Sequence, residues 1–332
     1  MKKNAHEKRP IASVTKVMTL LLVFEETDCG ALSLSDTVTA SAHACSMGGS
    51  QIWLEEGETL SVEDMIKAVV ICSANDCAVA LAEKISGTEE AFVARMNERA
   101  KELSMNDTHF VNACGLDAEG HVSSAHDVAV MSCELIKHEK VKEYATVWQD
   151  TLRGGEFTMT NTNKLLRSYQ GITGLKTGFT SKAGYCLSAT AERDGLSLCA
   201  VVLGGQTAKE RNADVSSILD YGFANYVSFT PTPDRPLMPV KVNMGEKEFA
   251  PVELSRREPV TLKRSASDKP EKTVTLEDTL KAPVKKGQKV GEMTVTQGGK
   301  TVSRIDIVAS SDVPRLGFRG IFKRLFKAAA LR

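Results

Sequence analysis

The chain has neither an excess of basic residues nor a long apolar run. Lys+Arg and Asp+Glu both total 42, which gives a formal net charge of zero. Nucleic-acid-binding proteins usually carry a basic excess, so we expect no nucleic-acid partner. No run of about 18 or more apolar residues occurs, and the sequence therefore predicts no membrane-spanning helix. The composition, 42% hydrophobic and 25% charged, is that of an ordinary globular protein.

Zinc-site and disulfide signatures are also missing, although the chain has eight cysteines. None lies in a Cys-x-x-Cys pair or at zinc-ligand spacing from a histidine, so no metal is expected. A chain of 332 residues does not need a disulfide framework, and we expect buried or free thiols that say little about the redox compartment. The cysteines are Cys29, Cys45, Cys72, Cys77, Cys114, Cys133, Cys186 and Cys199.

Helical and strand patterns alternate from residue 13 to residue 225. Residues 61–86 form one continuous helical pattern that opens with a capping signature, Ser61 followed three residues later by Asp64. Residues 183–205 read as two strands joined by a turn at Arg193-Asp194-Gly195. These patterns predict an α+β fold with helices around an antiparallel sheet. Further helices are expected at 88–104, at 124–138 with Ser123 or Ser124 as cap, and at 208–226.

The pattern changes at residues 230–236, TPTPDRP, where prolines cluster and helical periodicity stops. Short alternating segments follow, and Gln297-Gly298-Gly299 between two of them is a hairpin signal. We therefore predict a first domain over 1–229, a small all-β domain over 230–313 and a separate C-terminal segment over 314–332.

The stretch IASVTKVMTLLL, residues 11–22, has a lysine where the apolar pattern begins. A helix that is apolar on every side belongs in the core of a large domain, and Lys16 there is costly unless it is paired or its pKa falls. Ser13 and Lys16 share one helix face at i and i+3, so a lysine with a lowered pKa could activate a serine nucleophile. The alternative is an N-cap serine beside a lysine that extends to solvent.

Two further triplets favour the catalytic interpretation. Ser73-Ala74-Asn75 lies within the 61–86 pattern, and Lys176-Thr177-Gly178 leads into the predicted strands. Ser-x-x-Lys, Ser-x-Asn and Lys-Thr-Gly, in this order, are the motif set of penicillin-binding proteins and class A β-lactamases. Each triplet alone also fits an ordinary polar turn, whereas the ordered set indicates a shared site.

The sequence resembles the serine-type D-alanyl-D-alanine carboxypeptidases, the low-molecular-weight penicillin-binding proteins, over essentially the whole chain. Besides the three motifs, the resemblance rests on GSQIWLEEGETLSVEDMIKAVVICSANDCAVALAE, THFVNACGLDAEGHVSSAHDVAVM, GLKTGFTSKAGYCLSATAERDGLSLCAVVLGG and VKKGQKVGEMTV. It implies a penicillin-binding/β-lactamase-like domain, a C-terminal β domain and a C-terminal amphipathic membrane-anchor helix. The enzyme would act at the outer face of the bacterial cytoplasmic membrane.

The resemblance also implies a reaction on peptidoglycan stem peptides. Ser13 would attack the carbonyl between two terminal D-alanines, and Lys16 would accept its proton. Ser73 would relay a proton to the leaving amine, and Asn75 would contact the substrate backbone. Water would then hydrolyse the acyl-enzyme without a metal or organic cofactor, and β-lactam antibiotics would be covalent inhibitors.

The remaining roles implied by the resemblance fall on the Lys-Thr-Gly segment. Lys176 would supply positive charge near the substrate, and Thr177 would help to hold its terminal carboxylate. Gly178 belongs to the same substrate-binding segment, and the N–H of Phe179 would form an oxyanion hole with the N–H of Ser13.

Two positions make a less direct match to the family. Arg211 matches an arginine near the cleft of relatives and could hold the substrate carboxylate with two hydrogen bonds, although a solvated helix position explains it equally well. His126 stands where some relatives have arginine, and we leave it out of the site. Asp127 beside it is expected to be a structural hydrogen-bond acceptor.

Two other functions remain open. A class A-like β-lactamase shares the three motifs, but its deacylating Glu-x-x-x-Asn pattern is absent, because Thr160 follows Glu156 at that spacing. An inactive cell-wall-binding protein is the second alternative, and the intact set of catalytic residue types argues against it.

The two ends of the sequence carry their own predictions. Residues 315–332, taken as a helix, place Phe318, Phe322 and their apolar neighbours on one face and basic residues on the other. Such a helix lies in a membrane interface without crossing it, so we expect contact with an anionic membrane surface.

At the other end, MKKNAHEKRP has no apolar leader, although a substrate outside the membrane requires export. The family has further strand-forming residues before its nucleophile, so we expect additional sequence upstream of Met1.

Overall fold

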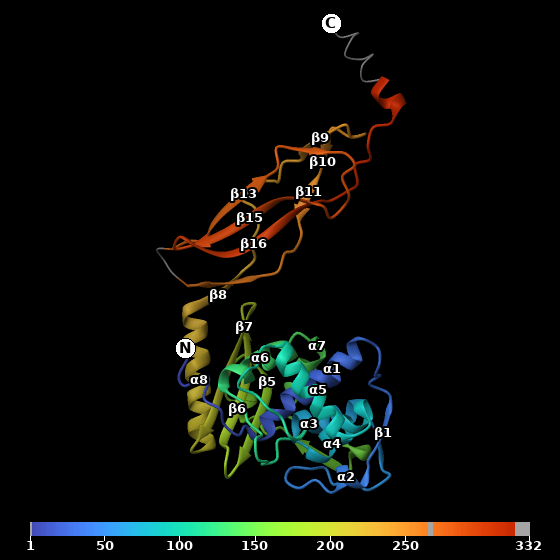
Figure 1. The fold of residues 1–332 in the computed structure, drawn as a ribbon. Coiled ribbons are helices and arrows are strands. Elements are labelled where there is room, and N and C mark those ends of the chain that lie inside the picture. Colours follow the sequence, from blue (N-terminus) through green and yellow to red (C-terminus); the bar gives the residue numbers. More distant parts are fainter. Residues whose placement is uncertain (1, 265–267, 323–332) are drawn as a thin grey trace. The chain divides into compact units, whose positions relative to one another are not determined.

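The computed structural model describes residues 2–264 and 268–322, and it divides into two units. The first, called the helical unit, comprises Met1–Arg193 and Ser197–Gly222. The second, called the β unit, comprises Asp194–Leu196 and Phe223–Arg332. Figure 1 shows the α-helices gathered in the first unit, together with some of the strands, and mainly strands in the second. Each unit has its own apolar core, so each is described by itself.

Helices are the main regular elements of the helical unit. The α-helices are α1 (Lys16–Asp28), α2 (Ala42–Cys45), α3 (Val62–Ile71), α4 (Asn75–Ser86), α5 (Glu89–Glu102), α6 (Ala125–Leu135), α7 (Glu139–Ala145) and α8 (Ala208–Asn225). Three short 3₁₀ helices add to them: η1 (Ala12–Thr15), η2 (Arg153–Gly155) and η3 (Lys164–Arg167).

Three small sheets complete this unit. The strands are β1 (Thr37–Thr39), β2 (Thr59–Ser61), β3 (Gln149–Leu152), β4 (Phe157–Thr160), β5 (Ile172–Thr180), β6 (Gly184–Arg193) and β7 (Leu196–Gly205). Strands β1 and β2 pair, β3 and β4 form a hairpin, and the order of the main sheet is β5-β6-β7. Antiparallel pairing sets Gly178 of β5 opposite Cys186 of β6. The predicted α+β arrangement is confirmed, as are two strands joined at Asp194.

Helix α1 lies in the centre of the core, as its uniformly apolar sequence predicts. All nine residues from Lys16 to Phe24 are buried. The helix packs against α6 and α4 and against strand β5. A stretch with no polar face needs such cover on every side, and the cost falls on Lys16, the one charged residue among these nine.

The continuous helix predicted over residues 61–86 is wrong in one respect. The structure divides it into α3 and α4, because Cys72 ends α3 and Ser73 adopts a left-handed backbone with φ +68°. A left-handed conformation is uncommon for a residue with a Cβ atom and cannot continue an α-helix. The break frees Ser73 from the helix and starts α4 at Asn75.

Side-chain caps begin α3 and α6 where the sequence predicts them. The hydroxyl of Ser61 accepts from the N–H of Asp64, and that of Ser124 accepts from the N–H of Asp127. Each satisfies one of the backbone donors left free at a helix start. The carboxylate of Asp127 also accepts from the Asp107 N–H, so its predicted structural role is confirmed.

The β unit has three sheets around a separate apolar core. Its strands are β8 (Tyr226–Phe229), β9 (Val240–Asn243), β10 (Phe249–Ala250), β11 (Val252–Leu254), β12 (Val260–Lys263), β13 (Glu271–Leu276), β14 (Thr279–Lys281), β15 (Lys289–Gln297) and β16 (Lys300–Ala309). The sheet orders are β11-β16-β15-β13, β10-β9-β14 and β12-β8. Strands β15 and β16 form the hairpin predicted from Gln297-Gly298-Gly299, with Gln297 paired to Lys300.

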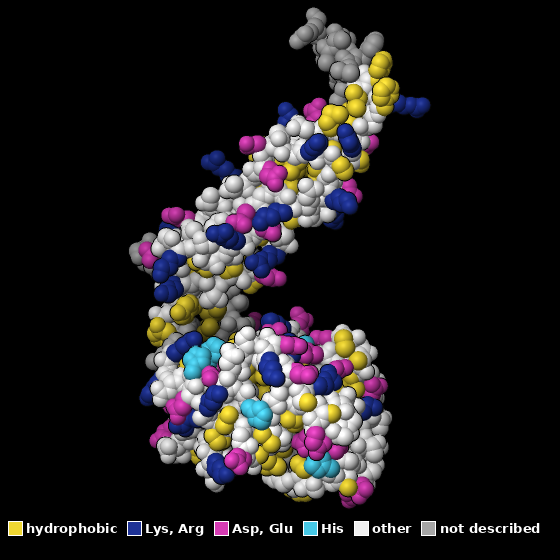
Figure 2. Space-filling model, in the orientation of Figure 1, with side chains coloured by type: hydrophobic (Ala, Val, Ile, Leu, Met, Phe, Trp, Pro, Cys, Tyr) yellow, Lys and Arg dark blue, Asp and Glu magenta, His cyan; other side chains and the backbone are white. Residues whose placement is uncertain are grey.

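The C-terminal segment is described only in its first part. Residues 318–322 are helical, and Phe318 and Phe322 are 84% and 63% exposed. Figure 2 shows hydrophobic side chains at this end of the described chain. The rest of the predicted amphipathic helix, residues 323–332, lies outside the described residues. Within the described residues, no helix has the length and apolar character needed to cross a membrane.

All eight cysteines fall within the described residues and are free thiols. Cys77, Cys114 and Cys186 are buried, and the others are exposed or partly exposed. This confirms the prediction of buried or free thiols made from the sequence.

Candidate active site

The start of α1 is held in an unusual backbone path that presents Ser13. Ala12 has φ +47°, which is uncommon for a residue with a Cβ atom and tends to occur at functional sites. Two glycines make room for this turn. A Cβ atom on Gly115 would lie 2.0 Å from the Ala12 oxygen, and one on Gly178 would lie 3.0 Å from the Ser13 nitrogen. Larger residues at either position would displace the serine.

Lys16 donates three hydrogen bonds, one for each proton of its ammonium group. The acceptors are Ser13 Oγ at 2.9 Å, Asn75 Oδ1 at 2.5 Å and the Cys114 carbonyl oxygen at 2.6 Å. The side chain is completely buried, and burial lowers its pKa from 10.5 to about 8, against the opposing effect of nearby acidic groups such as Asp76. Lys16 therefore loses its proton far more easily than an exposed lysine does.

The geometry around Lys16 determines where its lone pair points once it is neutral. The amide oxygen of Asn75 and the carbonyl of Cys114 are acceptors only, so they hold the two remaining N–H groups. The third position then faces Ser13 Oγ at 2.9 Å, within reach for proton transfer. At this distance a neutral Lys16 could take the proton of the Ser13 hydroxyl without a histidine.

Ser73 and Asn75 lie on the segment that joins α3 to α4. Asn75 is fixed at both ends of its amide, since Nδ2 donates to the Gly48 carbonyl at 2.6 Å. The hydroxyl of Ser73 is buried and has no hydrogen-bond partner among the described residues. An unpaired buried hydroxyl costs free energy, and here it is available to a substrate.

Strand β5 supplies the second wall of the site. Lys176 is buried and donates to the Thr177 carbonyl at 3.0 Å. Burial, and then the positive charge of Lys16, hold the pKa of Lys176 well below its ordinary value. Thr177 Oγ1 donates to Thr162 Oγ1 at 2.7 Å, which fixes the hydroxyl at the strand. Phe179 follows, 56% exposed and packed against Tyr185 with ring centroids 4.4 Å apart.

Arg211 of α8 is buried and does not bond to any of these residues. Its guanidinium donates to the Cys186 carbonyl at 3.3 Å and to Asn212 Oδ1 at 2.8 Å. Burial lowers the pKa of Arg211. Because Cys186 pairs with Gly178 across the sheet, Arg211 reaches the strand next to the Lys-Thr-Gly segment. Contact with a substrate carboxylate stays a prediction.

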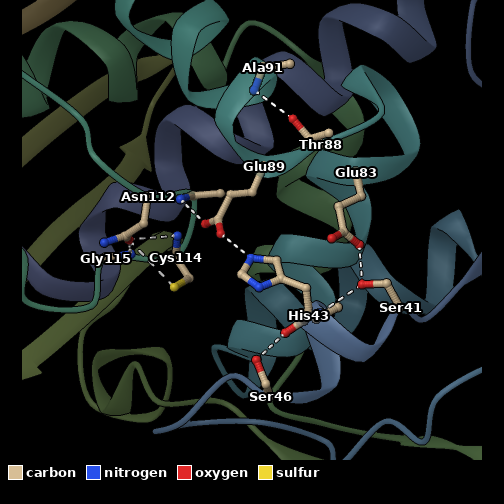
Figure 3. Close-up of polar contacts among 12 residues, drawn as sticks. Ser41, His43, Ser46, Glu83, Thr88, Glu89, Ala91, Asn112, Cys114 and Gly115 are labelled. Carbon is tan, nitrogen blue, oxygen red and sulfur yellow. Dashed lines mark hydrogen bonds and ion pairs between the residues drawn. The ribbon is translucent and has the colours of Figure 1, made fainter.

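Sequence reasoning missed the support behind the Cys114 carbonyl. Asn112 Oδ1 accepts from the Gly115 N–H at 2.6 Å and from the Cys114 N–H at 3.3 Å. Glu89 Oε1 accepts from the Ala113 N–H at 2.9 Å, and Oε2 bonds to the ring of His43 (Figure 3). The loop that presents the carbonyl to Lys16 is therefore fixed by two side chains. The Asn-x-x-Gly spacing, typical of a side-chain-closed turn, was the available signal.

A buried histidine, also missed, holds η1, the segment that precedes α1. His121 Nδ1 accepts from the Val111 N–H at 3.0 Å, so the neutral ring carries its proton on Nε2 and donates to Thr15 Oγ1 at 2.7 Å. Burial lowers the pKa of His121 to about 4. A neutral histidine thus anchors the residue next to Lys16. No group of three or more His, Cys, Asp or Glu side chains suited to a metal ion occurs among the residues the structure covers.

Comparisons with known proteins agree with this geometry. The D-alanyl-D-alanine carboxypeptidase family model matches residues 1–207, and the model of the penicillin-binding protein 5 C-terminal domain matches residues 232–315. The D-alanyl-D-alanine carboxypeptidase DacF of Bacillus subtilis is 41% identical over 329 residues, which are 97% of this chain and 84% of that protein.

Solved structures are similar as well. Penicillin-binding protein 5 from Haemophilus influenzae has a TM-score of 0.79 at 28% identity, covering 94% of this chain and 93% of that one. Penicillin-binding protein D2 from Listeria monocytogenes, in its ampicillin-bound form, has a TM-score of 0.62 at 37% identity, covering 67% and 91%. The predicted penicillin-binding fold with a C-terminal β domain is confirmed, and the chain belongs to the D-alanyl-D-alanine carboxypeptidase family.

Proposed function

We propose that this protein removes the terminal D-alanine from peptidoglycan stem pentapeptides through an acyl-enzyme on Ser13. The observation that carries the proposal is the contact of 2.9 Å between Lys16 Nζ and Ser13 Oγ, in a buried site where the lysine pKa falls to about 8. Family membership supports the reaction class.

In the acylation step, neutral Lys16 takes the proton of Ser13 as Oγ bonds to the carbonyl carbon between the two D-alanines. The C=O bond opens to an oxyanion, which the N–H groups of Ser13 and Phe179 would stabilise. The close approach of Gly178 to the Ser13 nitrogen, where a Cβ atom would come within 3.0 Å, supports this pairing of β5 with the nucleophile.

Collapse of the oxyanion breaks the C–N bond and expels the amine of the last D-alanine, which needs a proton. Ser73 would relay to this amine the proton that Lys16 took from Ser13, because its hydroxyl is buried and unpaired among the described residues. Protonated Lys176 would supply positive charge near this hydroxyl. Water then attacks the ester and gives a proton to neutral Lys16; the C–Oγ bond breaks, and Lys16 returns that proton to Ser13 Oγ.

Substrate binding uses groups on both walls. Asn75 would contact the peptide backbone, and Thr177 together with the positive charge of Lys176 would hold the terminal carboxylate. Arg211 would add a charge to the same carboxylate if its guanidinium turned away from the Cys186 carbonyl. Gly178, which has no side chain, leaves room for Ser13 and for the substrate that would bind beside Ser13.

β-Lactam antibiotics fit the same site as substrate mimics whose acyl-enzyme persists. A relative, penicillin-binding protein D2 from Listeria monocytogenes, has structures in ampicillin-bound and cefotaxime-bound forms. Such a substrate places the enzyme outside the cytoplasmic membrane. The basic, aromatic sequence of residues 315–332 would hold it to an anionic membrane surface, on the outer face.

The test is labelling by a fluorescent penicillin followed by D-alanine release from a defined pentapeptide. Ser13→Ala should abolish both, and Lys16→Arg should nearly abolish both, because a guanidinium cannot act as a base near neutral pH. Ser35→Ala, which changes an exposed serine, is the matched control and should behave like the wild type. Full labelling of Ser13→Ala would remove Ser13 from its role.

The same experiment separates the alternatives. A carboxypeptidase keeps the label for a long time and releases D-alanine. A β-lactamase loses the label rapidly, and an inactive cell-wall-binding protein never acquires it.

A further inference from the structure

Trp53 is a large aromatic residue that the helical unit holds out toward solvent. Its side chain is 65% exposed, and its backbone adopts φ +56°. A left-handed backbone is unfavourable for a bulky residue, and exposing a large apolar side chain to water does not stabilise the fold. The surrounding residues must therefore maintain this position.

Two consecutive residues at the start of α4 hold the loop that carries Trp53. Asn75 bonds to its first part, through its N–H to the Ser50 carbonyl at 2.7 Å and its amide to the Gly48 carbonyl. The buried carboxylate of Asp76 accepts from the N–H groups of Ile52 at 3.0 Å and Leu54 at 3.2 Å, on either side of Trp53. Since Asn75 also bonds to Lys16, the loop is continuous with the catalytic site.

The other side of the loop is fixed by Arg153. Its guanidinium donates to the carbonyls of Ile52 at 2.9 Å and Trp53 at 3.3 Å, and it is paired with Glu58 at 2.7 Å. The Trp53 ring packs edge-on against Phe157, with centroids 5.8 Å apart. Trp53 and Phe157 together form what we call the aromatic ledge. The Trp53 carbonyl and backbone groups of both its neighbours are thus hydrogen-bonded, while the indole stays largely exposed.

We propose that the aromatic ledge is a binding subsite for the neutral, N-acetylated pyranose sugar that carries the stem peptide. The inference rests on the proposed function, because that reaction supplies a substrate with a glycan attached beyond the peptide. The C–H face of a pyranose ring is apolar and matches an open indole face, while its hydroxyl and amide groups stay in water. The ledge adjoins the Asn75 side of the site, where the peptide backbone would run.

The charge beside the ledge favours a neutral ligand over a cationic one. The Arg153 guanidinium lies 5.6 Å from the centre of the Phe157 ring and donates to the carbonyl of Trp53. The Phe157 ring already has this guanidinium against it, itself paired with Glu58, and a ring so occupied attracts a second cation weakly. The ammonium group of a diamino residue in the stem peptide is therefore the less favoured occupant.

The experiment compares two substrates, a free stem pentapeptide and the same pentapeptide attached to its N-acetylated disaccharide. Trp53→Ala should lower kcat/KM for the disaccharide substrate by about tenfold. It should leave the free pentapeptide and the rate of penicillin acylation unchanged. Trp53→Phe should retain most of the preference for the sugar. Val111→Ala, at another exposed apolar side chain of this unit, should change neither substrate.

Each other result has its own meaning. An equal loss on both substrates would mean that Trp53 supports Asn75 and binds no sugar, and an unchanged preference would mean that the ledge binds nothing. A loss confined to pentapeptides with a free diamino side chain would identify a cation site. Each of these three results would overturn the proposal. Failure of the wild type on both substrates would instead refute the proposed function.

Discussion

The helical unit and the β unit bury different kinds of side chain. All the buried polar or charged side chains among the described residues lie in the helical unit. In the described part of the β unit, the buried side chains are apolar, among them Val290, Met293, Ile305 and Ile307. The two units therefore differ in what their interiors can do, although both have a packed core.

The difference shows that the helical unit bears the larger cost in folding free energy. Burial of a polar group is costly unless it is paired, and a buried lysine is among the costliest. The helical unit buries both Lys16 and Lys176 and leaves the hydroxyl of Ser73 unpaired. The described part of the β unit buries no lysine, although its Ser311 hydroxyl is also buried without a hydrogen-bond partner among the described residues. Changes in the two interiors should have separable consequences.

The largest expected separation comes from the β-unit core. Ile307→Ala removes a fully buried side chain from β16 and should lower the free energy of unfolding of this unit by roughly 2–5 kcal/mol. Urea unfolding followed by circular dichroism measures the loss. Val302→Ala, at an exposed position of the same strand, should cost little. Penicillin acylation of the folded protein should stay unchanged, and a parallel loss of acylation would show that the interiors are coupled.

A somewhat smaller effect is expected at His121, whose pKa in the folded protein is about 4 against an ordinary value of 6.5. As the pH falls through this interval, the unfolded chain binds the proton first, so stability decreases. The loss from this group should approach roughly 3 kcal/mol by pH 4. Urea unfolding across this range should show a shallower decrease for His121→Gln than for the wild type, whereas exposed His109→Gln should follow the wild type. Identical slopes for all three would contradict the buried neutral ring.

The smallest effect on catalysis is expected at the C-terminal segment. Leu316 donates to the Met244 carbonyl at 2.7 Å, so a truncation after Gly317 keeps the contacts of the β unit. Removal of residues 318–332 should leave D-alanine release from a free pentapeptide intact. It should abolish binding to vesicles with anionic lipid in a sedimentation assay. Zwitterionic vesicles are the control, and vesicle binding that survives truncation would place the membrane contact elsewhere.

Much of the fold could be predicted because its signals are local. The apolar pattern around Lys16, the serine caps of Ser61 and Ser124 and the glycine turn between β15 and β16 each act within a few residues. The division of α3 from α4 could not be read in the same way. Helical periodicity continues through Ser73, and its left-handed backbone depends on tertiary contacts that no local pattern encodes.

Prediction of the site from the sequence meets the same limit. Ser13, Lys16, Ser73 and Asn75 are visible in the sequence as side chains at motif spacing. The Cys114 carbonyl that holds Lys16 is a backbone group, and backbone groups have no residue type to recognise. Its role follows from a contact between residues far apart in the chain, as does that of His121.

The central claim is that buried Lys16 is the base for Ser13, and the pH dependence of β-lactam acylation tests it most directly. Only neutral Lys16 can take the proton, and its pKa is about 8. The second-order acylation rate should therefore rise about tenfold per pH unit on the acid side and level off above pH 8. A rate that is constant from pH 6 to pH 9, or that levels off below pH 7, would contradict a lysine base.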